Sequence, residues 1–231
     1  MKNILVILGV LAVVAVVGAA GYERFFKPNP PVIAGPASSA PAEPAAAPAT
    51  PVADALQVRP GDLVIGEAAA TVTIIEYASL TCPHCAAFHA NTLPALKERY
   101  IDKGNVKLVF RDFPLDGLAL RAAMLPHCAG PERYYGLLGT LFARQLQWAT
   151  AKDPLNALSS ISLQAGMNGE EFKACLANKA IEDQVLQSAM EASKGLGVNA
   201  TPTLFINGLK YSGALTIEQI GAVVDPLVGV K

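Results

Sequence analysis

The stretch IIEYASLTCPHCAAFH, which runs from Ile74 to His89, decides the fold. Its beginning belongs to a β-branched and mostly apolar run, Thr71–Tyr77, that is typical of a buried strand. Pro83 then opens a pattern of apolar residues at helical spacing that continues to Tyr100. Proline is favoured at the first helical position, because its missing N–H would be unpaired there. The stretch therefore predicts a strand that passes directly into a helix, with two cysteines at the junction.

The residues that follow predict an α/β fold with an all-helical insertion. Val106–Phe110 reads as a second strand, and strand, helix and strand together form a βαβ unit with parallel strands and a right-handed crossover. Pro94 should kink the first helix, because it removes one backbone hydrogen bond. From about residue 116 to 196 the pattern is helical only. The expected helices there are Ala119–Leu125, Arg133–Trp148, Leu155–Gln164, Glu170–Ala177 and Ile181–Lys194.

Strand signals return near the C-terminus. Thr203–Ile206 and Lys210–Ser212 flank the dipeptide Asn207-Gly208, and Asn-Gly between two short strands is a strong hairpin signal. Thr216, with Gln219 three residues later, forms a capping box that opens a last helix. The predicted order is therefore βαβ, a block of helices in which Asn168 caps one member, and ββα.

The first 55 residues differ in composition from the rest. Residues 4–20, ILVILGVLAVVAVVGAA, form an unbroken run of 17 apolar and small residues, between the lengths of a secretory signal and of a membrane-spanning helix. Residues 28–54 contain eight prolines and nine alanines, which favours an extended tether. We predict an N-terminal membrane anchor or signal sequence in residues 1–21, a Pro/Ala-rich linker in 22–55 and one folded domain in 56–231. The anchored form is favoured.

Cys82 and Cys85 form a C-x-x-C pair at the start of the expected helix. The first backbone N–H groups of a helix are unpaired, and with the helix dipole they favour an anion such as a Cys82 thiolate. Its pKa should fall well below the ordinary value of about 8.5, and a protonated His84 would add a second positive charge. Cys85, one turn further along, should be less exposed and act as the resolving thiol.

Other uses of this pair are weaker interpretations. Haem attachment requires C-x-x-C-H, and residue 86 is alanine. A structural zinc site needs four ligands, and Cys82, Cys85 and His89 supply three without a second C-x-x-C. A static structural disulfide is the remaining alternative, but a C-x-x-C ring at a helix start is readily reduced. A redox-active disulfide is therefore favoured.

The sequence resembles the DsbA family of thioredoxin-fold thiol–disulfide oxidoreductases over about residues 66–228. The resemblance is carried by Ile74–His89, by VKLVFRDFPL (Val106–Leu115) and by GVNATPTLFINGLKYSG (Gly197–Gly213). Pro-His between the cysteines is the dipeptide characteristic of the family. The resemblance implies a thioredoxin-like fold with a helical insertion at about 116–196.

The resemblance also implies roles for individual residues. Cys82 would be the attacking cysteine and Cys85 its partner. Glu76 would be a buried acid that moves protons on and off Cys85, whereas the alternative from the residues alone is an edge-strand charge facing water. The substrate-binding residues would be Pro83, Thr201 and Pro202, with Pro202 following a cis peptide bond.

Function and location are expected to follow from these roles. The protein should introduce disulfides into exported proteins with free thiols, as a monomer in the periplasm tethered to the inner membrane. A DsbB-like membrane quinone reductase should reoxidise it, and neither cofactor, metal nor nucleic acid is expected. Thr201 leaves a second hypothesis open, because threonine before the cis proline is common in isomerase and reductase relatives. A third hypothesis, a tethered chaperone-like or metal-binding module, has no methionine cluster to support copper binding.

A second cysteine pair lies in the helical block. Cys128 and Cys175 are 47 residues apart, and in an oxidising compartment an even number of cysteines suggests a bridge. Such a bridge would join two helices and constrain the unfolded chain. Two free, buried cysteines are the alternative, and His127 is expected to be a histidine at a helix end.

Overall fold

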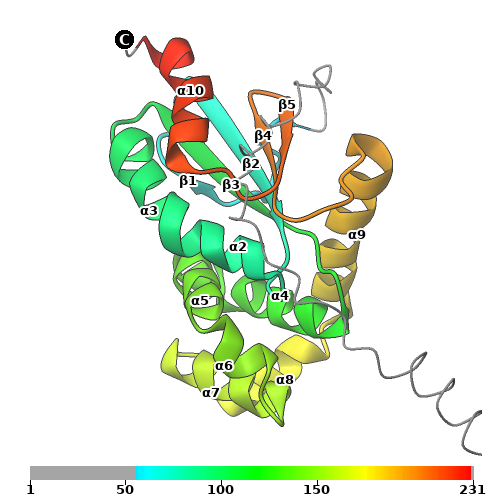
Figure 1. Ribbon diagram of the computed structural model, residues 1–231. Coiled ribbons are helices and arrows are strands. Elements are labelled where there is room, and N and C mark those ends of the chain that lie inside the picture. Colours follow the sequence, from blue (N-terminus) through cyan, green and yellow to red (C-terminus); the bar gives the residue numbers. More distant parts are fainter. Residues whose placement is uncertain (1–55, 230–231) are drawn as a thin grey trace, which may run out of the picture. The chain divides into compact units, whose positions relative to one another are not determined.

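A five-stranded mixed sheet forms the centre of the protein, for which the computed structural model describes residues 56–229 (Figure 1). The strand order is β1-β3-β2-β4-β5; β2 and β3 are parallel, and the other neighbouring pairs are antiparallel. The strands are β1 (Val64–Ile65), β2 (Val72–Ala78), β3 (Val106–Asp112), β4 (Thr203–Ile206) and β5 (Leu209–Ser212). The predicted thioredoxin-like fold is confirmed. The edge strand β1 was not predicted, because two residues are too short to show alternation.

The hairpin between β4 and β5 was predicted from Asn-Gly and is confirmed. Asn207 and Gly208 adopt φ angles of 45° and 85°, the left-handed conformation that a two-residue turn of this kind requires at both positions. The side chain of Asn207 also accepts a hydrogen bond from the N–H of Thr73 at 2.8 Å. The turn is thereby attached to the central strand β2.

The helix after the cysteines is continuous along the chain but changes its winding twice. It consists of α2 (Pro83–Ala87), the π-helical turn η1 (Phe88–Thr92), α3 (Leu93–Leu96) and the π-helical turn η2 (Lys97–Ile101). Where the sequence predicts a kink, at Pro94, the structure has a short α-helix with π-helical turns on both sides. π-helical turns inside helices are frequent at functional sites, and η1 begins three residues after Cys85.

The helical block contains the five predicted helices, one of them divided. They are α4 (Gly117–Ala129), α5 (Pro131–Ala143), α6 (Gln145–Ala149), α7 (Pro154–Gln164), α8 (Gly169–Leu176) and α9 (Lys179–Leu196). The helix predicted from Arg133 to Trp148 was wrong as a single element, because Arg144 leaves the helical conformation between α5 and α6. The capping boxes at Asn168 and at Thr216 are present, and the latter opens α10 (Ile217–Val228).

Three groups of buried side chains hold these layers together. One face of the sheet packs against the α2–α3 helix and α10, and the opposite face packs against α9 (Figure 1). The helices α4–α8 build a third core on the carboxyl ends of β2 and β3, and both Cys82 and Cys85 belong to that core. Within residues 56–229 no helix is both long and apolar enough to cross a membrane. The anchor or signal predicted in residues 1–21 and the linker in 22–55 lie outside the described residues.

Candidate functional site

The two cysteines lie where β2 ends and α2 begins, against the helical block. Cys82 is the N-cap residue of α2, and Pro83 occupies the first helical position. Both cysteines are free thiols. Cys82 keeps 4% of its surface exposed, whereas Cys85, one turn further along, keeps none. Of the two cysteines, only Cys82 therefore retains exposed surface.

The surroundings of Cys82 lower the pKa of its thiol to about 5. The largest cause is the hydrogen bond from the Cys85 thiol; the Thr201 hydroxyl and the backbone N–H groups of Cys85 and His84 act in the same direction, and burial opposes them. These N–H groups are among those that a helix leaves unpaired in its first turn. At neutral pH Cys82 is thus a thiolate, the reactive form in disulfide exchange. The ring of His84 is exposed to solvent.

A loop from the other half of the fold lies against Cys82. The peptide bond between Thr201 and Pro202 is cis, and Pro202 is buried. As a thiol, Cys82 donates a hydrogen bond from Sγ to the carbonyl oxygen of Thr201 at 3.3 Å. The buried hydroxyl of Thr201 has no hydrogen-bond partner within residues 56–229. A Cys82 thiolate would give this hydroxyl an acceptor.

Cys85 has the opposite electrostatic environment. The pKa of its thiol is raised far above the ordinary value, chiefly because the side chain is buried, and further because it donates to Cys82 and lies near the negative charge of Glu76. Desolvation and a like charge both disfavour a second anion. The reduced pair therefore holds one thiolate, at Cys82, and one proton, at Cys85.

Glu76 lies beneath the cysteine pair in the central strand. Its side chain is fully buried, and its neighbours across the sheet are Phe110 of β3 and Leu204 of β4. The alternative of an edge-strand charge facing water is therefore wrong. Both carboxylate oxygens contact Nε2 of His89, at 3.0 and 3.2 Å. The sequence suggested His89 only as a zinc ligand, although its position four residues after Cys85 places both on one helix face.

The comparisons with known proteins agree with this geometry. A family model described as thioredoxin matches residues 58–226. The crystal structure of alpha-DsbA1 from Wolbachia pipientis has 34% sequence identity and a TM-score of 0.71, and the alignment covers 75% of this chain and 94% of that one. The chain belongs to the DsbA family. The predicted thioredoxin fold and the predicted family are thereby confirmed.

Two further relatives define the extent of the likeness. A protein of Rickettsia conorii named as a protein-disulfide oxidoreductase is 32% identical over 170 residues, which are 73% of this chain and 61% of that protein. The match thus spans less than two thirds of this relative. Oxidised BdbD from Bacillus subtilis is 22% identical with a TM-score of 0.66, and the alignment covers 73% of this chain and 94% of that one, a likeness that shows the fold.

The helical insertion of this DsbA-family protein contacts the active-site turn directly. Gln145, at the start of α6, is buried and donates hydrogen bonds from Nε2 to the carbonyl oxygens of Leu80 (2.8 Å) and Cys82 (2.9 Å). Asp116 caps α4 and also accepts a hydrogen bond from the hydroxyl of Thr81 at 2.7 Å. Sequence reasoning missed both residues, because a glutamine at a helix start carries no sign of a partner 63 residues away.

The second cysteine pair forms a disulfide in the structure. Cys128, in the last turn of α4, is bonded to Cys175 of α8 with an S–S distance of 2.03 Å. The neighbouring His127 is not merely a helix-end residue, because its Nε2 lies 2.7 Å from Oδ2 of Asp112 at the end of β3. This hydrogen bond connects the helix that carries the disulfide with the strand next to β2.

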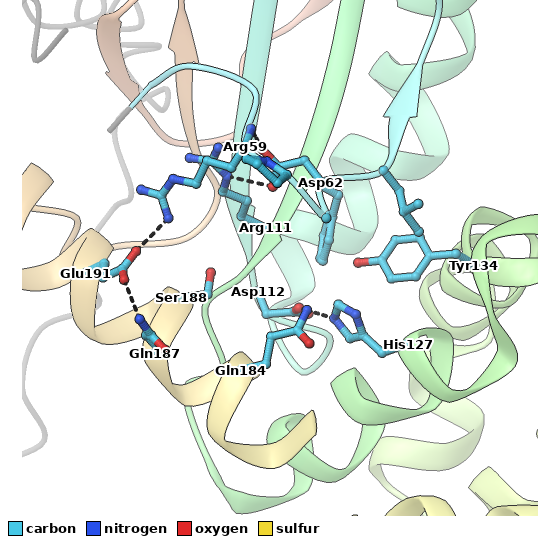
Figure 2. A pocket seen from close by; sticks show the side chains of 14 residues that line it. Arg59, Asp62, Arg111, Asp112, His127, Tyr134, Gln184, Gln187, Ser188 and Glu191 are labelled. Atoms are coloured by element: carbon cyan, nitrogen blue, oxygen red, sulfur yellow. Dashed lines mark hydrogen bonds and ion pairs between the residues drawn. The ribbon is translucent and has the colours of Figure 1, made fainter. Parts of the chain in front are cut away.

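A separate polar cavity of about 390 Å³ lies at the edge of β3 (Figure 2). Its walls come from the loop before β1, the end of β3, α4, α5 and α9, and neither Cys82 nor Cys85 lines it. Figure 2 shows Asp112 and His127 facing one another across part of the cavity, with Ser188 of α9 opposite. The charged groups in it are largely paired, so the cavity is part of the scaffold rather than of the redox site.

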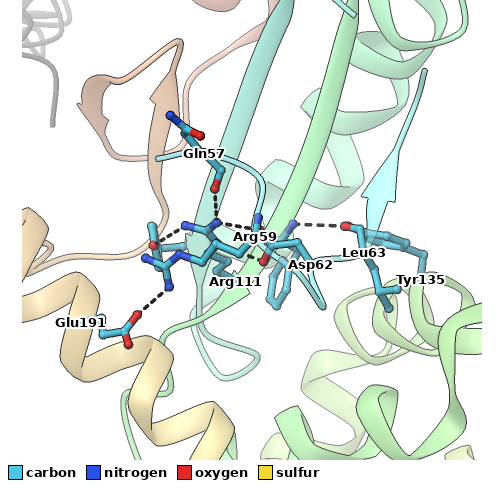
Figure 3. Close-up of polar contacts among 9 residues, drawn as sticks. Gln57, Arg59, Asp62, Leu63, Arg111, Tyr135 and Glu191 are labelled. Carbon is cyan, nitrogen blue, oxygen red and sulfur yellow. Dashed lines mark hydrogen bonds and ion pairs between the residues drawn. The ribbon is translucent and has the colours of Figure 1, made fainter. Parts of the chain in front are cut away.

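A buried arginine joins the N-terminal loop of the domain to the sheet (Figure 3). Arg111 of β3 donates to Asp62 at 2.6 Å, to the carbonyl oxygen of Gln57 at 2.8 Å and to the hydroxyl of Tyr77 at 3.0 Å. Its side chain is 4% exposed, so the ion pair with Asp62 is desolvated. Removing one partner of such a pair leaves an uncompensated buried charge.

The zinc hypothesis receives no structural support from the described residues. Nε2 of His89 faces Glu76, not the cysteines. In residues 56–229 no three side chains of His, Cys, Asp or Glu converge in a way that could hold a metal ion.

The substitution Cys85→Ala tests the origin of the low pKa of Cys82. It removes the hydrogen bond that is the largest cause of the shift. We expect the pKa of Cys82 to rise from about 5 towards its ordinary value of 9.0, as measured by thiolate absorbance at 240 nm against pH. The matched variant His84→Ala retains its backbone N–H and should titrate near 5. An unchanged midpoint in Cys85→Ala would show that the hydrogen bond is not the cause.

The substitution Gln145→Leu tests the contact between the insertion and the active-site turn. It leaves two carbonyl groups without this donor, and an unsatisfied buried polar group costs about 1–3 kcal/mol. We expect the free energy of unfolding, measured in urea, to fall by about that amount. Gln147→Leu is the matched control, because Gln147 is exposed on the same short helix. Equal stability of the two variants would contradict the assignment.

Proposed function

We propose that the protein is a thiol oxidase that introduces disulfides into exported polypeptides through the pair Cys82–Cys85. The observation that carries this proposal is the difference between the two thiols: the pKa of Cys82 is lowered to about 5, and that of Cys85 is raised. A stabilised thiolate is a good leaving group and favours the reduced form of the pair. The disulfide form is correspondingly ready to accept electrons from a substrate.

The reaction consists of two exchanges at Cys82. A substrate thiolate attacks Sγ of Cys82, the Cys82–Cys85 bond breaks, and its electron pair passes to Sγ of Cys85, which takes up a proton. A second substrate thiolate attacks the substrate sulfur of the mixed disulfide, and Cys82 leaves as a thiolate. The substrate gains one disulfide, and the protein is left with two reduced cysteines.

The surface beside Cys82 supports unfolded polypeptides as the substrate class. Leu115 and Leu146 have exposed fractions of 55% and 72%. Each is adjacent in sequence to a residue that contacts the active-site turn, Asp116 in one case and Gln145 in the other. Exposed apolar side chains near a reactive cysteine favour chains whose own apolar residues are still uncovered. The cis-proline loop would hold the substrate backbone.

Location and partners are part of the same proposal. The DsbA relatives favour a compartment outside the cytoplasm, and the apolar run of residues 4–20 favours an inner-membrane anchor in residues 1–21. Residues 22–55 would tether the folded domain, 56–231, as a monomer on the periplasmic side. A DsbB-like membrane quinone reductase would restore the Cys82–Cys85 disulfide.

A second candidate, disulfide isomerase or reductase, is favoured by Thr201. Its hydroxyl lowers the pKa of Cys82 and has no other partner in the described part of the chain. A group that interacts with Cys82 in its reduced form changes the rate at which a mixed disulfide is released. Rapid release without net oxidation is what an isomerase requires.

Two ribonuclease assays distinguish the candidates: the oxidised protein with reduced, unfolded ribonuclease, and the reduced protein with scrambled ribonuclease. An oxidase, added in stoichiometric amount, should convert ribonuclease thiols to disulfides and itself become reduced, as followed by mass spectrometry after thiol alkylation. An isomerase should instead restore activity to scrambled ribonuclease while the thiol count stays constant. Cys82→Ala should abolish both reactions. A Cys82→Ala variant that kept full cellular function would contradict any enzymatic proposal and favour a chaperone-like or metal-binding module.

A further inference from the structure

Glu76 and His89 form a hydrogen-bonded pair that links the interior beneath Cys85 to the surface. Glu76 has no exposed surface, and His89 is the only group that hydrogen-bonds its carboxylate within residues 56–229. The ring of His89 is held between aromatic side chains, stacked on Phe142 of α5 with a centroid distance of 4.0 Å and edge-on to Phe110 at 6.0 Å. These contacts hold Nε2 against the carboxylate.

The other nitrogen of His89 lies at the exposed edge of the ring. The side chain of His89 keeps 8% of its surface exposed. Nδ1 has no hydrogen-bond partner in the described part of the chain. The buried polar side-chain atoms without a hydrogen-bond partner in this part of the chain are the hydroxyls of Ser162, Ser188 and Thr201. Nδ1 of His89 is not one of them, so it is exposed to solvent. His89 thus offers one nitrogen to Glu76 and the other to solvent.

Cys85 needs such a connection, because it exchanges a proton in every reaction cycle and is fully buried. Its surroundings keep it protonated when reduced. Glu76 is close enough for its charge to act on Cys85. Glu76 also acts on Tyr134 and Tyr135 of α5, whose pKa values are raised chiefly by burial, so neither exchanges protons at neutral pH.

We propose that His89 is the proton relay of the redox pair, acting on Cys85 through Glu76. When the Cys82–Cys85 bond breaks, the electron pair goes to Sγ of Cys85, and the proton of the Glu76–His89 pair moves to that sulfur. The pair then recovers a proton from water at Nδ1 of His89. On reoxidation by a partner disulfide, the sulfur of Cys85 displaces the partner's sulfur from Cys82 and gives its proton to the pair, and the pair releases a proton to water at Nδ1 of His89. The relay rests on the proposed redox cycle of Cys82 and Cys85, and it applies whether the protein acts as an oxidase, an isomerase or a reductase.

Single-turnover reduction of the oxidised full-length protein by dithiothreitol tests this proposal. His89→Gln keeps a hydrogen-bond donor for Glu76 but cannot pass on a proton. We expect its rate constant at pH 7 to fall by at least about 100-fold, the lower end of the range for general acid–base catalysis. Glu76→Gln should show a similar loss, and the double variant should be no slower than the slower single variant. In His89→Ala, added imidazole should restore part of the rate.

Controls separate a relay from a structural role. Asn91→Ala, an exposed residue on the same helix, should react at the wild-type rate. If the His89 variants do not fold, as shown by circular dichroism, the wild-type rate should still fall at least two-fold in D₂O. Wild-type rates in His89→Gln across the pH range, no rescue by imidazole, or no isotope effect would overturn the relay. If reduction by dithiothreitol depends on His89 but the oxidised wild-type protein transfers no disulfide to ribonuclease, the relay stands and only the proposed oxidase function is refuted.

Discussion

A thiol and a carboxylate buried side by side cannot both ionise, and the rest of the site depends on this constraint. Cys85 and Glu76 lie in the interior between the central strand and the helix that follows it, both without exposed surface. Burial, the hydrogen bond to Cys82 and the negative charge of Glu76, in this order of size, raise the pKa of Cys85 and keep its proton in place. Cys85 can then donate its hydrogen bond to Cys82, and this bond is the largest cause of the low pKa of Cys82. The acidity of the outer thiol is therefore a consequence of the protonation of the inner one.

The thioredoxin core supplies this arrangement, and the helical insertion holds it in place. β2 carries Glu76, the first turn of α2 carries both cysteines, and the loop before β4 brings Thr201 to Cys82. From the insertion, Gln145 binds the active-site turn and Phe142 supports the ring of His89. Leu146, the residue after Gln145, is exposed to solvent. The insertion thus contributes directly to the environment of the thiols.

The parts of the fold that could be predicted from the sequence are those with local signals. The β-branched run before the cysteines, Asn207-Gly208 and the capping box at Thr216 each specify their own element and are found where expected. The break between α5 and α6 has no glycine or proline to mark it, and β1 is too short to have a pattern. At the site, the C-x-x-C motif alone indicated a redox-active disulfide between Cys82 and Cys85. The contacts of Gln145 and His89 depend on tertiary packing across 63 and 13 residues and have no local signature.

The central claim is that a stabilised Cys82 thiolate makes the pair an oxidant, and its most direct test is the reduction potential as a function of pH. Equilibration of the purified protein with glutathione buffers should give a value nearer to the potential of about −120 mV known for DsbA itself than to the value of about −270 mV for thioredoxin. Above pH 5 reduction takes up one proton, at Cys85, and below pH 5 it takes up two. The potential should therefore change by about 30 mV per pH unit above that point and about 59 mV below it. A potential of about −200 mV or lower, or a slope of about 59 mV through neutral pH, would contradict the claim.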